Sequence, residues 1–241
     1  MTLYIVGFGG GSHEGMTIEA ENAILSSDII VGYTVYADLM KEIFPEKEFF
    51  STPMMQERER VRYALEKACE CTVSLICSGD STVYGMAGLA YQMSDGYPQV
   101  KIVPVAGVTA ALSGNAVLGA PLTHDFAVIS LSDLLTPYEK IECRLRCASE
   151  ADFTMVLYNP SSKKRSDYLK KACEIMLQYK NEDTVCGYVR NIGRKEEESR
   201  ILTLGELKDC CVDMFTTVFV GNSQTRIING KMVTPRGYRD V

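Results

Sequence analysis

The chain contains no tryptophan, only two histidines among 241 residues, and no long uninterrupted apolar run. No apolar stretch approaches the ~18 residues that a membrane-spanning helix needs, and the N-terminus lacks the basic region of a secretory signal peptide. The sequence therefore predicts a cytoplasmic protein without a membrane partner.

Basic residues are fewer than acidic ones. The chain has 25 lysines and arginines but 31 aspartates and glutamates, so its formal net charge at pH 7 is −6. A general nucleic-acid-binding protein normally shows a basic excess in its total charge. The composition therefore argues against a nucleic-acid partner, although a local cluster of basic residues could still bind an anionic ligand.

The nine cysteines do not follow a metal-binding or disulfide pattern, because no CxxC pair occurs among them. Cys143 and Cys147 lie four residues apart and would share a helix face, but no histidine stands near them, which disfavours zinc. An odd number of cysteines in a chain without a signal peptide favours a reducing compartment. We therefore expect reduced thiols packed in the core, and no metal site.

Short apolar runs alternate along the chain with amphipathic stretches, and 46% of the residues are hydrophobic. This alternation is typical of parallel strands that are buried on both faces and joined by crossover helices. The predicted fold class is therefore α/β. Strands are expected at residues 3–6, 29–31, 73–77, 101–103, 127–129, 153–157, 184–189 and 216–220.

Two helices can be placed with some precision. One is expected over residues 56–69, where apolar residues recur at the i, i+3, i+4, i+7 spacing of a core-facing stripe. The sequence Thr136-Pro137-Tyr138-Glu139 has the form of a capping box with proline at the first helical position. A second helix should therefore run from this box through Ile141, Leu145 and Ala148.

The segment of residues 119–122 is the one plausible domain junction. A small-residue helix ends there before a new strand, and Pro121 favours a break in secondary structure. We therefore expect two α/β domains, residues 1–120 and 121–241, with a ligand cleft between them.

Polar turns that contain glycine or asparagine follow four of the predicted strands, at residues 7–12, 77–88, 104–111 and 158–162. Open α/β sheets bind ligands at the carboxyl ends of their strands. The first turn does not fit the dinucleotide pattern GxGxxG, because Ser12 stands where the third glycine is required. Its glycines still require a close approach of the backbone, either to a ligand or to another part of the molecule. In the second turn, Asp80 could accept hydrogen bonds from an amine or a ribose, or be a solvated acid.

Taken together and in this order, the turns resemble the tetrapyrrole (corrin and porphyrin) methylase family. The family has a glycine-rich N-terminal turn, a GDxxxYG turn and a GxTAA turn, which residues 7–11, 79–85 and 107–111 match. Within the family, the precorrin-3B C17-methyltransferase branch of cobalamin biosynthesis is resembled by residues 118–126, 129–137, 157–160 and 220–223. The resemblance covers nearly the whole chain.

The resemblance implies an S-adenosylmethionine-dependent C-methyltransferase that acts on C17 of precorrin-3B, or of its cobalt-bearing counterpart cobalt-factor III, with contraction of the macrocycle. It implies a homodimer, a small-molecule tetrapyrrole substrate, and a cofactor folded between the two domains. One alternative is a family member that acts on another corrin position, on a translation factor or on ribosomal RNA. The other is a nucleotide-binding module without catalytic activity. The sequence does not decide whether the substrate carries cobalt.

The resemblance also implies cofactor-binding residues, carried over by motif: Gly10, Ser78, Gly79, Asp80, Val83, Thr109, Ala110 and Asn159. Gly10 departs from the family pattern, which has proline at this position, so its contact is the least secure. A further cofactor contact is expected between Tyr188 and Asn191.

The proposed substrate carries many carboxylates, so the site should present cationic groups. The candidates are Arg190, Arg194, Lys163 and Arg165, for each of which a solvated surface position is the alternative. Ser130 and Ser132 are also expected to bind substrate, because they follow a predicted strand.

Contraction of the ring requires proton transfers, for which histidine is the natural side chain near neutral pH. We predict catalytic roles for His124 and the adjacent Asp125, with His13 in the first glycine turn as the alternative. A hydrogen-bonded structural histidine is an equally good interpretation of either position.

Overall fold

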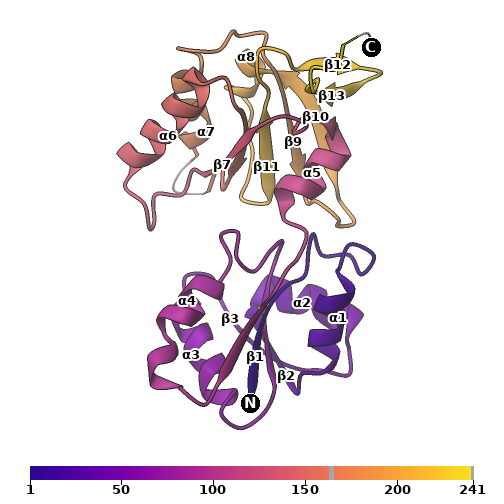
Figure 1. Ribbon diagram of the computed structural model, residues 1–241, viewed down its shortest axis with the longest axis vertical. Helices are drawn as coiled ribbons and strands as arrows, with labels where there is room; N and C mark the ends of the chain where they lie inside the picture. The colour runs from indigo at the N-terminus through magenta and orange to yellow at the C-terminus, as the bar shows by residue number, and fades with distance from the viewer. Residues whose placement is uncertain (163–165, 240–241) are drawn as a thin grey trace. The chain divides into compact units, whose positions relative to one another are not determined.

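The computed structural model describes residues 1–162 and 166–239, and the chain divides into two compact units, Met1–Ala110 (unit 1) and Ala111–Val241 (unit 2) (Figure 1). The division lies ten residues before the predicted junction at 120/121. The reason is that helix α5 (Ala110–Leu118) packs on the sheet of unit 2, where Gly114 faces the ring of Phe219 and Leu118 lies against Gly187.

Unit 1 is a parallel five-stranded sheet of order β3-β2-β4-β1-β5. Its strands are β1 (Thr2–Gly7), β2 (Ile29–Tyr33), β3 (Glu48–Thr52), β4 (Val73–Cys77) and β5 (Lys101–Val105). Its helices are α1 (Ile18–Leu25), α2 (Thr34–Ile43), α3 (Glu57–Lys67), α4 (Ala87–Gln92) and the short turn η1 (Ser94–Gly96). Strand β3 was not predicted, because only two of its five residues, Phe49 and Phe50, are apolar.

Helices cover both faces of this sheet, α3 and α4 on one side and α1 and α2 on the other (Figure 1). Successive strand residues point to opposite faces, so Ile5 packs under α3 and α4 while Val6 packs under α1 and α2. The predicted stripe is confirmed by the complete burial of Val61, Ala64 and Leu65 of α3 and of its C-cap residue Ala68.

Unit 2 contains a second five-stranded sheet, of order β10-β9-β11-β8-β7, and a small sheet of order β12-β13-β6. The strands are β6 (Gly119–Ala120), β7 (Phe126–Ser130), β8 (Thr154–Tyr158), β9 (Val185–Arg190), β10 (Glu198–Thr203), β11 (Thr216–Val220), β12 (Arg226–Ile228) and β13 (Lys231–Val233). Besides α5, the helices are α6 (Tyr138–Glu150), α7 (Tyr168–Met176) and α8 (Leu204–Leu207).

The expectation of parallel strands is wrong for most of the second sheet. Only β7 and β8 pair in parallel, whereas β8, β11, β9 and β10 pair antiparallel with their neighbours. Antiparallel strands can be joined by a short loop, and β9 is followed by β10 without an intervening helix. The apolar runs predict buried strands correctly, but burial on both faces does not specify strand direction.

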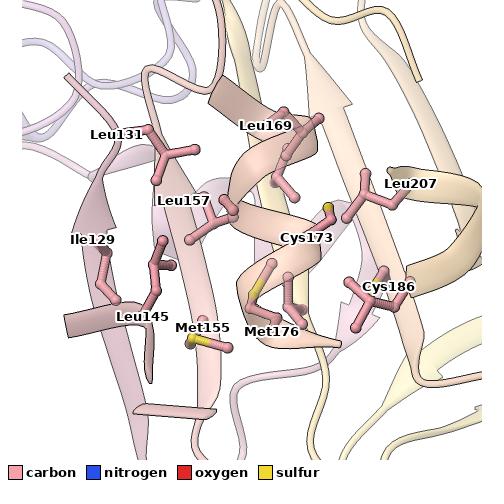
Figure 2. Packing of buried hydrophobic residues seen from close by; sticks show 14 of the residues in the cluster. Ile129, Leu131, Leu145, Met155, Leu157, Leu169, Cys173, Met176, Cys186 and Leu207 are labelled. Carbon is pink, nitrogen blue, oxygen red and sulfur yellow. The ribbon is translucent and has the colours of Figure 1, made fainter. Parts of the chain in front are cut away.

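The core of unit 2 lies between the second sheet and helices α6, α7 and α8. Figure 2 shows Met176 of α7 packed toward Met155 and Leu157 of β8, and Cys173 of the same helix near Leu207 of α8. All five side chains are at most 2% exposed.

Helix α6 confirms the predicted apolar stripe but not the predicted capping box. Ile141, Leu145 and Ala148 are buried as expected. However, Pro137 occupies the N-cap position with an extended backbone, and no side chain caps the helix. The helix therefore starts one residue later than the motif indicates.

All nine cysteines are free thiols. The expectation that they are core residues holds for Cys77, Cys173 and Cys186, and burial raises the pKa of Cys77 to about 11. It is wrong for the exposed cysteines, which are Cys143, Cys147 and Cys211. In the described residues, no helix is both long and apolar enough to cross a membrane.

Candidate cofactor and substrate site

Three of the predicted glycine turns pack directly against one another at the carboxyl ends of β1, β4 and β5, which are neighbours in the first sheet. Gly9 and Gly79 exchange two backbone hydrogen bonds, of 3.0 Å from Gly9 N and 2.7 Å from Gly79 N. A Cβ added to Gly7 would lie 2.7 Å from Gly79 O and 2.8 Å from Gly107 N, closer than side chains tolerate. Gly7 is therefore required by the contact of the first turn with the second and third turns.

The carboxylate of Asp80 links the second turn to the third. Asp80 is only 8% exposed. Oδ1 accepts hydrogen bonds from Thr82 N at 2.7 Å, Thr82 Oγ1 at 2.6 Å and Val83 N at 3.1 Å, and Oδ2 accepts from Gly107 N at 2.9 Å. A carboxylate offers about four lone-pair positions, so this one is occupied within the protein. Asp80 therefore positions the turns.

The charge of Asp80 gives this part of the sheet a negative potential. Burial alone would raise the pKa of Asp80, but hydrogen bonds from Thr82, Gly107 and Val83 together lower it below the ordinary value of 3.8. The carboxylate is therefore ionised at neutral pH, and its hydrogen-bond donors are all neutral N–H and O–H groups. Such a site favours a cationic ligand over a phosphate.

The third turn also lies next to Gly79. A Cβ built on Gly79 would be 3.5 Å from Thr109 Cα and 3.7 Å from Ala110 N, and the φ of Gly79 is +71°. Tyr84 has the left-handed φ of +55° and is 57% exposed, so backbone strain is also located at this edge. The structure thus brings together the predicted cofactor residues of unit 1, namely Gly10, Ser78, Gly79, Asp80, Val83, Thr109 and Ala110.

In unit 2, the carboxyl ends of β7 and β8 bring together three other predicted site residues. Ser130 lies opposite Tyr158 in the parallel register, so Asn159 follows immediately beside it. Asn159 Nδ2 donates to Ser130 Oγ at 3.0 Å, and Ser132 N donates to the same oxygen at 3.2 Å. Asn159 adopts a φ of +53°, which asparagine tolerates better than most residues.

Arg190, the last residue of β9, lies at the same end of the second sheet. Leu157 of β8 and Tyr188 of β9 both pair with Val218 of β11, the strand between them, so the carboxyl ends of β8 and β9 are level. Its Nε donates to Asp213 Oδ2 at 2.8 Å, and this hydrogen bond raises the pKa of Arg190. Part of the guanidinium predicted to bind substrate is therefore engaged in an ion pair.

The other predicted cations have different positions. The guanidinium of Arg194 lies over the ring of Phe215, 5.5 Å from its centroid. Lys163 and Arg165 lie outside the described residues. Within the segment from Tyr188 to Asn191, Asn191 has a φ of +52°, the same left-handed conformation as Asn159.

His124 and Asp125 are not brought together with these groups. They precede β7, whereas Ser130 ends it, and a five-residue strand spans about 17 Å. At the amino end of β7, His124 Nδ1 accepts a hydrogen bond from Asp125 N at 2.9 Å, and both residues line a pocket of about 210 Å³ with Asp152. A catalytic role for His124 and Asp125 stays a prediction, which this separation disfavours.

The alternative histidine, His13, is half-exposed in the first glycine turn. Its Nε2 lies 2.7 Å from Glu21 Oε1, so it has a local carboxylate partner. This contact fits the structural interpretation that the sequence left open.

Sequence reasoning missed one residue at the carboxyl edge of the first sheet. Arg60, on α3, is 3% exposed, although the helical pattern assigned it to the charged, solvated side. A signal was present, since Arg60 stands four residues before Ala64 and therefore at the border of the buried stripe.

Residues 2–208 match the family model of the Tetrapyrrole (Corrin/Porphyrin) Methylases. The chain belongs to this family. As a member of a methylase family it is a methyltransferase, and the predicted membership is confirmed.

Relatives are similar over almost the whole chain. A probable cobalt-factor III C(17)-methyltransferase of Methanocaldococcus jannaschii is 45% identical, over 99% of this chain and 98% of the relative. A precorrin-3B C(17)-methyltransferase of a Sinorhizobium species is 37% identical, over 98% of this chain and 97% of the relative.

Solved structures confirm the predicted α/β fold class. The methyltransferase CobJ has a TM-score of 0.88 and 33% identity, covering 97% of this chain and 99% of its own. A uroporphyrin-III C-methyl transferase of Thermus thermophilus, complexed with S-adenyl homocysteine, has a TM-score of 0.72 and 21% identity, over 92% of this chain and 97% of its own. The second likeness concerns the fold alone.

Substitutions at Asn159 should separate its backbone role from its side-chain role. Asn159→Ala puts alanine at a φ of +53°, where it lacks the side-chain hydrogen bonds that help asparagine to adopt this conformation. The substitution should lower the free energy of unfolding by about 1 kcal/mol. Asn159→Gly removes the same amide but relieves the backbone. If the amide binds a ligand, both variants should lose affinity for S-adenosylhomocysteine equally, as measured by calorimetry. Unchanged affinity in both variants would remove Asn159 from the site.

Proposed function

We propose that this chain is an S-adenosylmethionine-dependent methyltransferase that methylates C17 of cobalt-factor III or precorrin-3B, with contraction of the macrocycle, in cobalamin biosynthesis. The observation that carries the proposal is the 45% identity, over nearly the full length of both chains, to a probable cobalt-factor III C(17)-methyltransferase. Family membership and the packed turns of unit 1 support the same conclusion.

The turns of unit 1 suit the proposed cofactor. Bound S-adenosylmethionine would supply an electrophilic methyl group on a positively charged sulfur. The ionised carboxylate of Asp80 places negative charge close to the turns without a neutralising cation among its hydrogen-bond partners. Gly79, Thr109 and Ala110 present backbone with little side-chain bulk, which allows the close approach of a nucleoside.

The main task of the protein in this reaction is to position the methyl donor and the acceptor. Methyl transfer from a sulfonium to carbon is an in-line displacement, so its rate depends on holding donor and acceptor in an attack geometry. Asp80 contributes by holding the second and third turns in register, through hydrogen bonds to Val83 and Gly107. Within unit 2, Asn159 and Ser130 present polar groups at the carboxyl ends of β8 and β7. We also propose that the enzyme works as a homodimer.

The cobalt-bearing substrate is favoured by the relatives. Two relatives named for cobalt-factor III are 45% and 43% identical to this chain, against 37% for a relative named for precorrin-3B. We therefore expect turnover of cobalt-factor III to exceed that of precorrin-3B.

The test is to incubate the protein with S-adenosylmethionine and each precursor, with and without cobalt, and to follow both products by mass spectrometry. We expect one methyl group gained per macrocycle and one S-adenosylhomocysteine formed. Calorimetry in parallel should show binding of S-adenosylhomocysteine and none of NAD. Cofactor binding without methylation of either macrocycle would reject the proposed substrates, and binding of NAD would reject the proposed cofactor.

A further inference from the structure

Arg60 is a buried cation whose close partners are all neutral. It projects from α3 to the carboxyl end of β3, where Nε donates to Thr52 Oγ1 at 3.0 Å. Nη2 donates to Thr52 O at 3.3 Å and to Pro53 O at 3.0 Å. These bonds orient the guanidinium and satisfy one side of it, but they do not neutralise its charge.

Among the described residues, no carboxylate lies within ion-pair distance of this guanidinium. Burial lowers the pKa of Arg60, opposed mainly by the more distant Glu57, yet an arginine remains protonated at neutral pH. Buried charges in proteins are normally paired, because an unpaired one loses its hydration without compensation. This arginine therefore lacks an anion that a ligand could supply.

The remaining capacity of Arg60 is at Nη1. Its contact is with Met86 Sδ at 3.6 Å, and a thioether is a weak acceptor. Methionine is also flexible, so Met86 can change rotamer at small cost. A carboxylate would form a charge-assisted hydrogen bond that is far stronger than the contact with sulfur. Met86 therefore covers the cation without satisfying it.

Arg60 lies beside the second glycine turn, to which Met86 belongs, but away from the first. Its guanidinium lies 5.8 Å from the centroid of the Tyr33 ring, at the end of β2, whereas the first glycine turn follows β1. Two strand spacings separate β2 from β1 in the sheet, or about 10 Å. A carboxylate at Arg60 would thus belong to a ligand group distinct from one seated in the first turn.

Apolar side chains are exposed next to this cation. Met54 and Met55 directly follow Pro53 and are 44% and 73% exposed, and Met55 has a φ of +68°. Apolar surface with one buried cation is complementary to a large apolar body that carries a carboxylate. A tetrapyrrole with carboxylate side chains has this chemistry.

We propose that Arg60 binds a carboxylate side chain of the tetrapyrrole substrate through Nη1, and that Met86 is displaced when it binds. The inference rests on the proposed function, since it takes the macrocycle as the ligand. Arg60 then selects for substrate charge at one position and helps to orient the ring.

The test compares the native macrocycle with analogues in which single carboxylates are converted to amides. Binding is measured by the change in tetrapyrrole absorbance, without turnover. For the wild type, we expect one amide analogue to bind about 10-fold to 100-fold more weakly than the acid. In Arg60→Met, acid and amide should bind equally, while S-adenosylhomocysteine affinity stays unchanged.

A second pair of variants leaves Arg60 in place and guards against misfolding. Met86→Glu supplies an internal carboxylate to Nη1 and should weaken binding of the acid at least 10-fold and abolish the difference between acid and amide. Met86→Gln, of the same size and neutral, should retain that difference.

Three results would overturn the assignment: no difference between acid and any amide in the wild type, equal behaviour of the two Met86 variants, or a matching loss of S-adenosylhomocysteine affinity in Arg60→Met. A wild-type protein that binds no tetrapyrrole would reject the proposed function as well, which separates the two failures.

Discussion

Replacing Gly107 with alanine should disrupt the carboxyl edge of unit 1 and abolish cofactor binding. The new Cβ would overlap the carbonyl oxygens of Gly79 and Gly7, both of which are backbone atoms that cannot rotate away. The three turns would have to separate, at a cost of about 3 kcal/mol or more in the free energy of unfolding. Chemical denaturation and calorimetry with S-adenosylhomocysteine measure the two effects.

Gly88→Ala is the matched control for this substitution. Gly88 lies in α4, and a Cβ there would meet no atom within 4 Å. Because alanine is the better helix former, the control should gain about 0.5 to 1 kcal/mol in stability and keep its ligand affinity. A Gly107→Ala protein as stable as the wild type would show that the turns do not need their close contact.

Asp80→Ala should have an effect of similar size for a different reason. The substitution removes the acceptor of Thr82 N, Thr82 Oγ1, Val83 N and Gly107 N. Donors left unpaired in a buried site cost more than the lost bonds themselves contributed, so we expect a loss of about 3 kcal/mol or more. Because the turns lose their connection, affinity for S-adenosylhomocysteine should fall as well.

Asp80→Asn and the pH dependence isolate the charge. The pKa of Asp80 is lowered in the folded protein, so its contribution is present above its ordinary pKa of 3.8 and is lost as the pH falls through the folded value. The stability difference between wild type and Asp80→Asn should therefore be full at pH 7 and shrink below about pH 4. Urea denaturation across this range provides the measurement.

Asp38→Ala controls for the loss of a surface carboxylate. Asp38 forms an exposed ion pair with Lys41, and such pairs contribute little to stability. This variant should unfold like the wild type at pH 7. A stability difference for Asp80→Asn that is the same at pH 3 and pH 7 would contradict the role of the charge.

The strands that could be predicted from the sequence are the buried ones. The runs that became β4 and β8 are mostly apolar, because helices cover both faces of their sheets, and so they stand out in the sequence. Strands β3 and β10 each contain only two consecutive apolar residues, Phe49-Phe50 and Ile201-Leu202, and leave no such signal. The direction of the strands in unit 2 could not be predicted from the apolar pattern either, since a buried strand has the same pattern whether it pairs in parallel or antiparallel.

The candidate site was predictable where backbone geometry demands a residue type. Gly7 and Gly107 lie too close to the neighbouring turns to accept a side chain, and Gly79 has a φ of +71°, so their positions in the sequence marked the turns and, with them, the family. The side chains were less predictable. Asp80 was expected to face a ligand, yet its oxygens face Thr82 and Gly107 of the same unit.

The sequence by itself determined the α/β class, the three glycine turns and the family, because each depends on residue types that close packing or chain reversal requires locally. Only the tertiary structure decided that His124 lies at the opposite end of β7 from Ser130, and that Arg60 is buried beside Thr52 without a carboxylate. The physical reason is that strand direction and side-chain burial follow from contacts between segments distant in the chain, which local patterns do not encode.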